Sequence, residues 1–165
     1  MNRPRRIPAI VVRKVAGDQI HLIEIDGDEV RDYVEKNLLY GKMKMEAWPQ
    51  PDAFASLVST MRIAKLVAEA NGNVSLVRVI DGCESPLQAI LRRHEAGAMR
   101  ADLLELATIH AVATRILEEL PNMSSAELVC AYQLDKQYRM DARAAQAPKS
   151  RAQRRLEERR ERKRS

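Results

Sequence analysis

The chain has 165 residues, which suits one domain with short tails, and 45% of them are hydrophobic, an ordinary share for a protein with a packed core. Aromatic residues make up only 4%, which disfavours an RNA-recognition sheet or a single-strand groove, because both need aromatic rings that stack on bases. The formal net charge is +5, and no apolar run approaches the about 18 residues of a membrane-spanning helix, so we expect a cytoplasmic protein that does not enter a membrane.

Positive charge is concentrated at the two ends of the chain. Residues 149–165 contain nine Lys or Arg against three Glu, a net charge of +6 that exceeds the +5 of the whole chain. Residues 1–14 add five cations and no acidic residue, so residues 15–148 sum to −6. This segregation predicts arms that bind a polyanion, most commonly nucleic acid, while a merely solubilising tail is the alternative. The predicted phosphate-binding residues of the arms are Arg3, Arg5, Arg6, Arg151, Arg154, Arg155, Arg159, Arg160, Arg162, Lys163 and Arg164.

The predicted fold is mainly α: a helical bundle with a small N-terminal β-hairpin and a basic C-terminal tail. A basic arm occupies residues 1–6, and two β-branched runs around Gly17-Asp18 predict a hairpin over residues 7–25. We expect the globular domain to span residues 7–148. The tail at 149–165 has one large apolar residue to bury, so it is expected to be disordered or marginally helical.

Helical periodicity dominates the rest of the chain. Residues 29–40 predict a short helix that ends at Gly41, and two prolines within residues 42–51 predict a loop. Pro121 separates two long helices that together span residues 99–145. The helices predicted after the loop are 52–70, 74–80, 85–95, 99–120 and 125–145.

Residues 63–95 have the layout of a helix-turn-helix. Two short helices follow the end of a longer one, and a Gly-containing turn over residues 81–84 joins them. The pattern Ser85-Pro86-Leu87-Gln88 is typical of a capping box with Pro at the first helical position. A plain αα-hairpin within a helical bundle would have the same breaks, so both interpretations stay open.

The last helix of this unit, over residues 85–93, is the candidate recognition helix. Ser85 and Gln88 in its N-terminal half would contact base edges, while Arg92 and Arg93 would lie near phosphates. The unit itself has little net positive charge, so the terminal arms would have to supply most of the phosphate contacts.

The same stretch resembles the DNA-binding segment of the Fis type over about residues 63–93. The matching residues are Gly72-Asn73-Val74-Ser75, then Gly82-Cys83-Glu84-Ser85 and Leu87. The resemblance implies a dimeric DNA-binding protein whose third helix enters the major groove. Val77 and Arg78 depart from it, because that family usually has a pair of small residues there.

No sequence pattern indicates catalysis, a metal site or a cofactor. Cys83 and Cys130 lie far apart, and the three histidines show no metal-ligand spacing with each other or with a cysteine. The sequence contains neither a phosphate-binding loop nor a dinucleotide fingerprint. We therefore expect a protein that is not an enzyme.

These features favour a nucleic-acid-binding protein that regulates transcription or packages nucleic acid. We expect it to act as a homodimer or higher oligomer and to bind duplex DNA in preference to RNA. An alternative of another class is a non-enzymatic assembly, scaffold or adaptor protein of a phage or other macromolecular complex. There the basic tail would dock on an acidic protein partner or on RNA.

Overall fold

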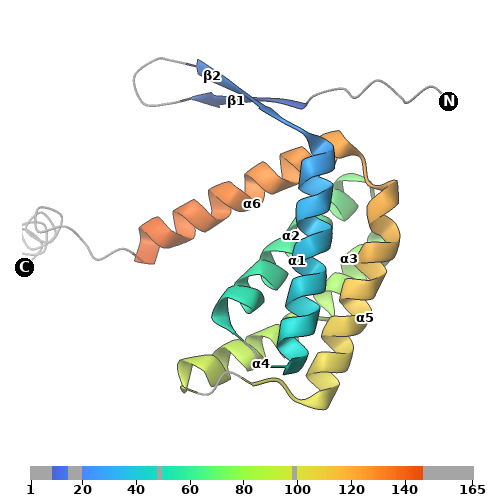
Figure 1. Ribbon diagram of the computed structural model, residues 1–165, viewed down its shortest axis with the longest axis vertical. Helices are drawn as coiled ribbons and strands as arrows, with labels where there is room; N and C mark the ends of the chain where they lie inside the picture. Colours follow the sequence, from blue (N-terminus) through green and yellow to red (C-terminus); the bar gives the residue numbers. More distant parts are fainter. Residues whose placement is uncertain (1–8, 15–19, 48–49, 98–99, 147–165) are drawn as a thin grey trace, which may run out of the picture. The chain divides into compact units, whose positions relative to one another are not determined.

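The computed structural model describes residues 9–14, 20–47, 50–97 and 100–146, and these residues are mainly helical (Figure 1). The predicted basic arm at 1–6 and the predicted basic tail at 149–165 lie outside the described residues. The chain divides into two compact units, residues 1–135 and residues 136–165. Among the described residues, no helix has the length and apolar character needed to cross a membrane.

Two strands precede the helices. Strand β1 (Ala9–Lys14) pairs antiparallel with strand β2 (Ile20–Ile25), with Ala9 opposite Ile25 and Lys14 opposite Ile20. The connection over residues 15–19 lies outside the described part of the chain. A two-stranded hairpin is only marginally stable alone in water.

Helix α1 (Gly27–Ala47) runs through Gly41 and into the segment predicted to be a loop. The predicted helix end at Gly41 is therefore wrong, and so is the predicted start of the loop at residue 42. A Cβ added at Gly41 would lie 3.0 Å from Cβ of Leu57 and 3.4 Å from the carbonyl oxygen of Ala53. Gly41 thus marks a close approach of two helices, and the next turn of α1 buries Met45 in the core.

The remaining helices follow the predicted periodicity, with shifted boundaries. Helix α2 has proline at its first position, and the later elements pack around an aliphatic core. These elements are α2 (Pro51–Ala70), α3 (Val74–Asp81), α4 (Glu84–Glu95), α5 (Leu103–Glu119), the 3-10 turn η1 (Leu120–Asn122) and α6 (Ser125–Gln146).

Two predicted helix starts are wrong. Helix α4 begins at Glu84, its N-cap is Cys83, and no side chain caps it, so the predicted capping box at Ser85 does not form. Helix α5 begins at Leu103 rather than at residue 99, because Asp102 caps it. The Asp102 side chain accepts a hydrogen bond from the Glu105 amide at 2.8 Å, and the Glu105 side chain accepts one from the Asp102 amide.

Buried polar groups join helices that are distant in sequence. Asp135 of α6 is 0% exposed, yet its carboxylate accepts a hydrogen bond from Ser59 Oγ at 2.6 Å and one from Arg62 Nη1 at 3.0 Å. Arg31 of α1 donates to the carbonyl oxygens of Leu120 and Met123, at 3.2 and 2.8 Å. These contacts fix the part of α6 up to Asp135 on α2, because leaving the buried Asp135 carboxylate unpaired would be costly, and the partly buried Arg31 joins α1 to the turn after α5.

In the described part of the second unit, residues 136–146 continue α6. Gln137 Nε2 donates a hydrogen bond to Asp141 Oδ1 at 2.8 Å, one turn further along, while Tyr138 and Met140 are exposed. This part of the helix therefore has polar and apolar groups at its surface.

The close approach of α1 and α2 at Gly41 predicts the effect of adding a side chain at this position. Replacing Gly41→Val should cost about 1–3 kcal/mol of unfolding free energy, because the added methyl groups overpack the α1–α2 contact. The exposed Ala55 of α2 provides the control: Ala55→Val should cost only about 0.5 kcal/mol through helix propensity. Urea unfolding measures both, and an unchanged Gly41→Val protein would contradict the close contact.

Candidate nucleic-acid interface

Helices α3 and α4 occupy the positions of the last two helices of the predicted helix-turn-helix, and both contact α5. Asn73 begins this α3–α4 unit: its side-chain oxygen accepts a hydrogen bond from the Leu76 amide at 3.1 Å and caps α3. Only Gly82 and Cys83 separate the two helices, so the predicted turn over residues 81–84 is shorter than expected. The buried residues of the unit are Leu76, Ile80, Cys83 and Ile90.

The outer face of α4 presents three of the four predicted contact residues. Ser85, Gln88 and Arg92 are exposed, and their i, i+3, i+7 spacing places them on one side of the helix. Gln88 Nε2 donates a hydrogen bond to Glu84 Oε1 at 3.1 Å. Glu84 and Glu95 are also exposed, so two carboxylates accompany the single arginine on this side.

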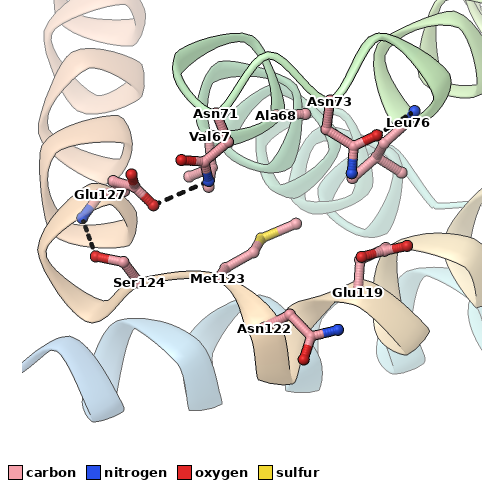
Figure 2. Close-up of a pocket in the computed structure, with 10 residues that line it drawn as sticks. All are labelled: Val67, Ala68, Asn71, Asn73, Leu76, Glu119, Asn122, Met123, Ser124 and Glu127. Carbon is pink, nitrogen blue, oxygen red and sulfur yellow. Dashed lines mark hydrogen bonds between the residues drawn. The ribbon is translucent and has the colours of Figure 1, made fainter.

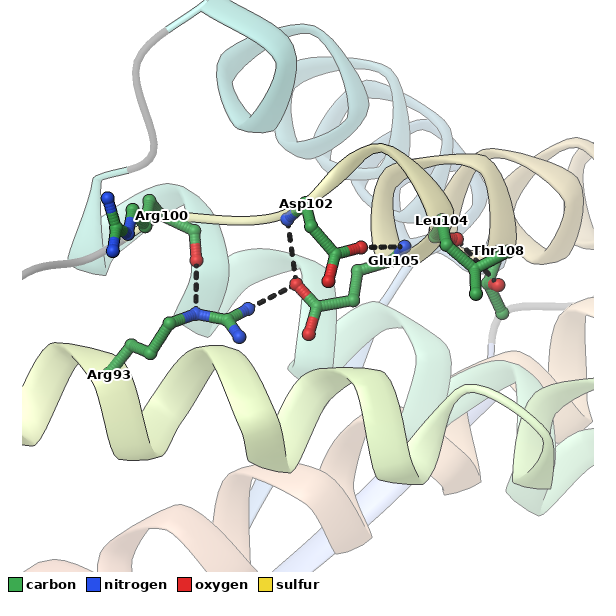
Figure 3. A network of polar contacts seen from close by, with 6 residues as sticks. All are labelled: Arg93, Arg100, Asp102, Leu104, Glu105 and Thr108. Atoms are coloured by element: carbon green, nitrogen blue, oxygen red, sulfur yellow. Dashed lines mark hydrogen bonds and ion pairs between the residues drawn. The ribbon is translucent and has the colours of Figure 1, made fainter.

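Arg93 lies apart from this face and binds within the protein. Its Nε donates to the carbonyl oxygen of Arg100 at 2.9 Å, and its Nη2 pairs with the carboxylate of Glu105, which is only 8% exposed (Figure 3). The same carboxylate belongs to the capping box of Asp102. Arg93 therefore anchors α4 to the start of α5, and two of its five N–H donors are engaged in these contacts. Sequence reasoning missed this role, although the Asp102-x-x-Glu105 pattern was visible.

A second cation near the unit is also engaged. Lys65 of α2 pairs with Asp81, the last residue of α3, at 2.6 Å, and lies 3.9 Å from Glu69. The hydrogen bond to Asp81 raises the pKa of Lys65 above its usual value. Lys65 thus holds the end of α3 on α2. The predicted cations of the two arms lie outside the described residues, so the described part of the interface has little free positive charge.

A pocket of about 410 Å³ lies where the end of α2 and the start of α3 meet the α5–α6 connection (Figure 2). Asn71 Nδ2 donates to Glu127 Oε2 at 3.0 Å, and Met123 lies between this pair and Glu119 in the view. Both charged residues among the ten that line the pocket are glutamates, so it would repel a phosphate. Among the described residues, no cluster of His, Cys, Asp or Glu could hold a metal ion.

Comparison of the chain with family models, with curated proteins and with solved structures finds no significant match. The interface must therefore be judged from its own residues.

The two cysteines should differ sharply in reactivity. Cys83 is fully buried at the α3–α4 turn, and burial raises the pKa of its thiol to about 11, whereas Cys130 is exposed. At pH 8 only about one Cys83 thiol in a thousand is ionised, and the thiolate is the reactive form. A chromogenic disulfide reagent should label Cys130 at least about 100-fold faster than Cys83.

The Cys130→Ser variant isolates the slow site. Its labelling should accelerate in urea in step with unfolding, since opening of the α3–α4 turn exposes the thiol. Rapid labelling of this variant in buffer would show that Cys83 is not buried as described.

Arg92 and Arg93 are neighbours with different expected roles. Arg93→Ala should lower the unfolding free energy by about 1.5–3 kcal/mol, because it leaves the buried Glu105 carboxylate without its charged donor. Arg92→Ala changes an exposed side chain and should stay within about 0.5 kcal/mol of the parent. Urea unfolding distinguishes them. A stable Arg93→Ala protein with weakened DNA binding would instead assign Arg93 to a phosphate.

Proposed function

We propose that the protein binds nucleic acid, duplex DNA in preference to RNA, through the cationic ends of its chain. The observation that carries the proposal is the segregation of charge: residues 149–165 sum to +6 and residues 1–14 to +5, while the body between them sums to −6. Arg and Lys on flexible or extended segments can follow a phosphate backbone and release its condensed counterions. Such binding needs no cofactor and no catalytic group.

In this proposal the α3–α4 unit is the part of the interface that would read sequence. Gln88 is a side-chain type that forms bidentate contacts with adenine, Arg92 is proposed to contact a phosphate, and both are exposed on one side of α4. Glu84 and Glu95 on that side would repel phosphates. The free energy of binding would therefore come mainly from the arms, and α4 would contribute discrimination between sequences. The Fis-type resemblance supports a homodimer with two such helices.

The acidic character of the α4 surface favours one alternative of another class. The outer side of α4 also carries Leu91, which is 42% exposed, beside Glu84. A mixed apolar and acidic helix face suits a protein partner, as in an assembly or scaffold protein of a phage or other particle. The basic tail would then dock on an acidic partner or on RNA.

The first experiment is fluorescence anisotropy of random duplex DNA with the full chain and with residues 1–148, at salt concentrations from about 50 to 300 mM. The tail should neutralise about five or six phosphates, which predicts a slope near −5 in a log–log plot of affinity against salt. The truncated chain should bind weakly with a shallow slope. If neither protein binds at the lowest salt, the nucleic-acid proposal fails. Competition with structured RNA tests the preference for DNA.

Point variants separate the proposed reader helix from the alternative. With the fold intact, Gln88→Ala should reduce binding to a selected site by about 5- to 100-fold through a lost base contact, whereas Arg92→Ala should weaken binding to all sequences through a lost phosphate contact. The Lys36→Ala variant of α1 is the control, because Lys36 is also exposed and on a helix. If all three bind alike while tail deletion abolishes a protein complex, the alternative is correct.

A further inference from the structure

The outer surface of α5 lacks the charges that normally cover an exposed helix. Residues 103–114 contain only two ionisable side chains, Glu105 and His110, and Glu105 is buried, although 31% of the whole chain is charged. Leu103 and Leu104 are 87% and 78% exposed. Consecutive, almost fully exposed leucines are unfavourable in water unless another surface covers them.

Four exposed, uncharged residues of α5 form one straight stripe beside Leu103, which we call the α5 stripe: Leu104, Ala107, Ala111 and Thr114. Their spacing of i, i+3, i+7 and i+10 is the pattern that keeps side chains on one seam of a helix pair. The opposite side of α5 packs inside the bundle through Ile109, Val112, Ala113 and Ile116. Helix α5 is thus apolar on both sides over its first three turns, which is typical of a helix that is covered on both sides.

We propose that the α5 stripe binds the α5 stripe of a second copy of this chain, with the two helices antiparallel. In this register, Ala107 of each copy lies opposite Ala111 of the other, and Leu104 lies opposite Thr114. The small alanine side chains allow the helix axes to approach closely, and the exposed leucine is covered by the methyl group of Thr114 and by the stem of Arg115. The contact is self-complementary, as a two-fold dimer requires.

Charge at the ends of the stripe identifies the occupant and its direction. Arg100 is exposed just before the stripe, and Glu118, whose carboxylate also accepts a hydrogen bond from Arg115 of the same helix at 3.2 Å, is exposed just after it. Antiparallel pairing in the register above brings Arg100 of each copy to Glu118 of the other, twice per dimer. Parallel pairing would bring like charges together at both ends and would align the helix dipoles unfavourably. A second copy therefore satisfies both the apolar stripe and the charges that flank it.

This inference specifies the homodimer named in the proposed function, but it concerns α5 alone and holds whether or not the protein binds DNA. Its test uses nuclease-treated full-length protein at high salt, so that no nucleic acid bridges the copies. Sedimentation equilibrium from about 1 to 100 µM should show a monomer–dimer equilibrium. A protein that stays monomeric throughout this range overturns the inference, whatever the outcome of the DNA-binding experiment.

Variants of the stripe test the surface. Ala107→Arg and Ala111→Arg should each weaken the dimer at least about 10-fold, because a large charged side chain separates the helices. Ala55→Arg, at an exposed position of α2, should leave the dimer unchanged. Circular dichroism checks that all three fold. A dimer that tolerates both stripe variants would place the interface elsewhere and overturn the inference.

Charge reversal tests the direction of pairing. Arg100→Glu and Glu118→Arg should each weaken the dimer, and the double variant should recover most of the lost affinity, because each copy then supplies both reversed partners. Lys36→Glu on α1 has the same charge change as Arg100→Glu and should have no effect. Failure of the double variant to recover, with both single variants impaired, would contradict the antiparallel register.

Discussion

Burial of the inner side of α5 is the interaction on which the helical bundle depends, because α1, α2, α3 and α4 all contact this helix. Its inner side chains, from Ile109 to Ile116, are aliphatic and almost fully buried. Ile109, Val112 and Ile116 each contribute about 1.5–3 kcal/mol through removal from water, and in the described part of the chain no aromatic side chain is fully buried to add to this. A core of small aliphatic groups stabilises only when helices approach closely, which explains why the α1–α2 contact contains a glycine.

Charged groups fix the relative positions of the helices, which the aliphatic core alone does not specify. Hydrophobic burial has little direction, so it tolerates sliding and rotation of one helix against another. The pairing of Arg93 with Glu105 fixes α4 at the start of α5, and Asp135 fixes α6 on α2 through Ser59 and Arg62. Each buried carboxylate accepts more than one hydrogen bond, so displacement of either helix would leave a charge unsatisfied. The arginine that sequence reasoning assigned to DNA is thus a fixed part of the bundle.

Helical periodicity predicted most of the helices. The errors at Gly41 and Arg93 lie where a residue acts through a partner on another helix, whereas the start of α5 was missed although its Asp102-x-x-Glu105 cap is local. Val30, Val34 and Leu38 repeat with the period of a helix, so α1 was predictable up to Gly41. Glycine ends helices more often than it lets them pack closely, and only the position of α2 decides between the two roles. The same holds for the candidate site. The exposure of Gln88 and Arg92 could be predicted from the pattern of α4, whereas the ion pair of Arg93 with Glu105 depends on the position of α5.

The distribution of charge and apolar surface also connects the proposed nucleic-acid binding by the arms with the proposed dimer through α5. A single cationic tail that neutralises about five or six phosphates binds weakly at physiological salt, because counterion release falls steeply with salt. Joining two copies through α5 would place two tails on one particle and make the second contact intramolecular, which raises overall affinity without any new contact. A dimer through the α5 stripe would leave the exposed side of α4, the proposed reader of base edges, uncovered. Self-association through the apolar stripe would depend less on salt than the arms do, because only the exposed Arg100–Glu118 pairs at its ends are screened, so assembly and nucleic-acid binding would respond differently to salt.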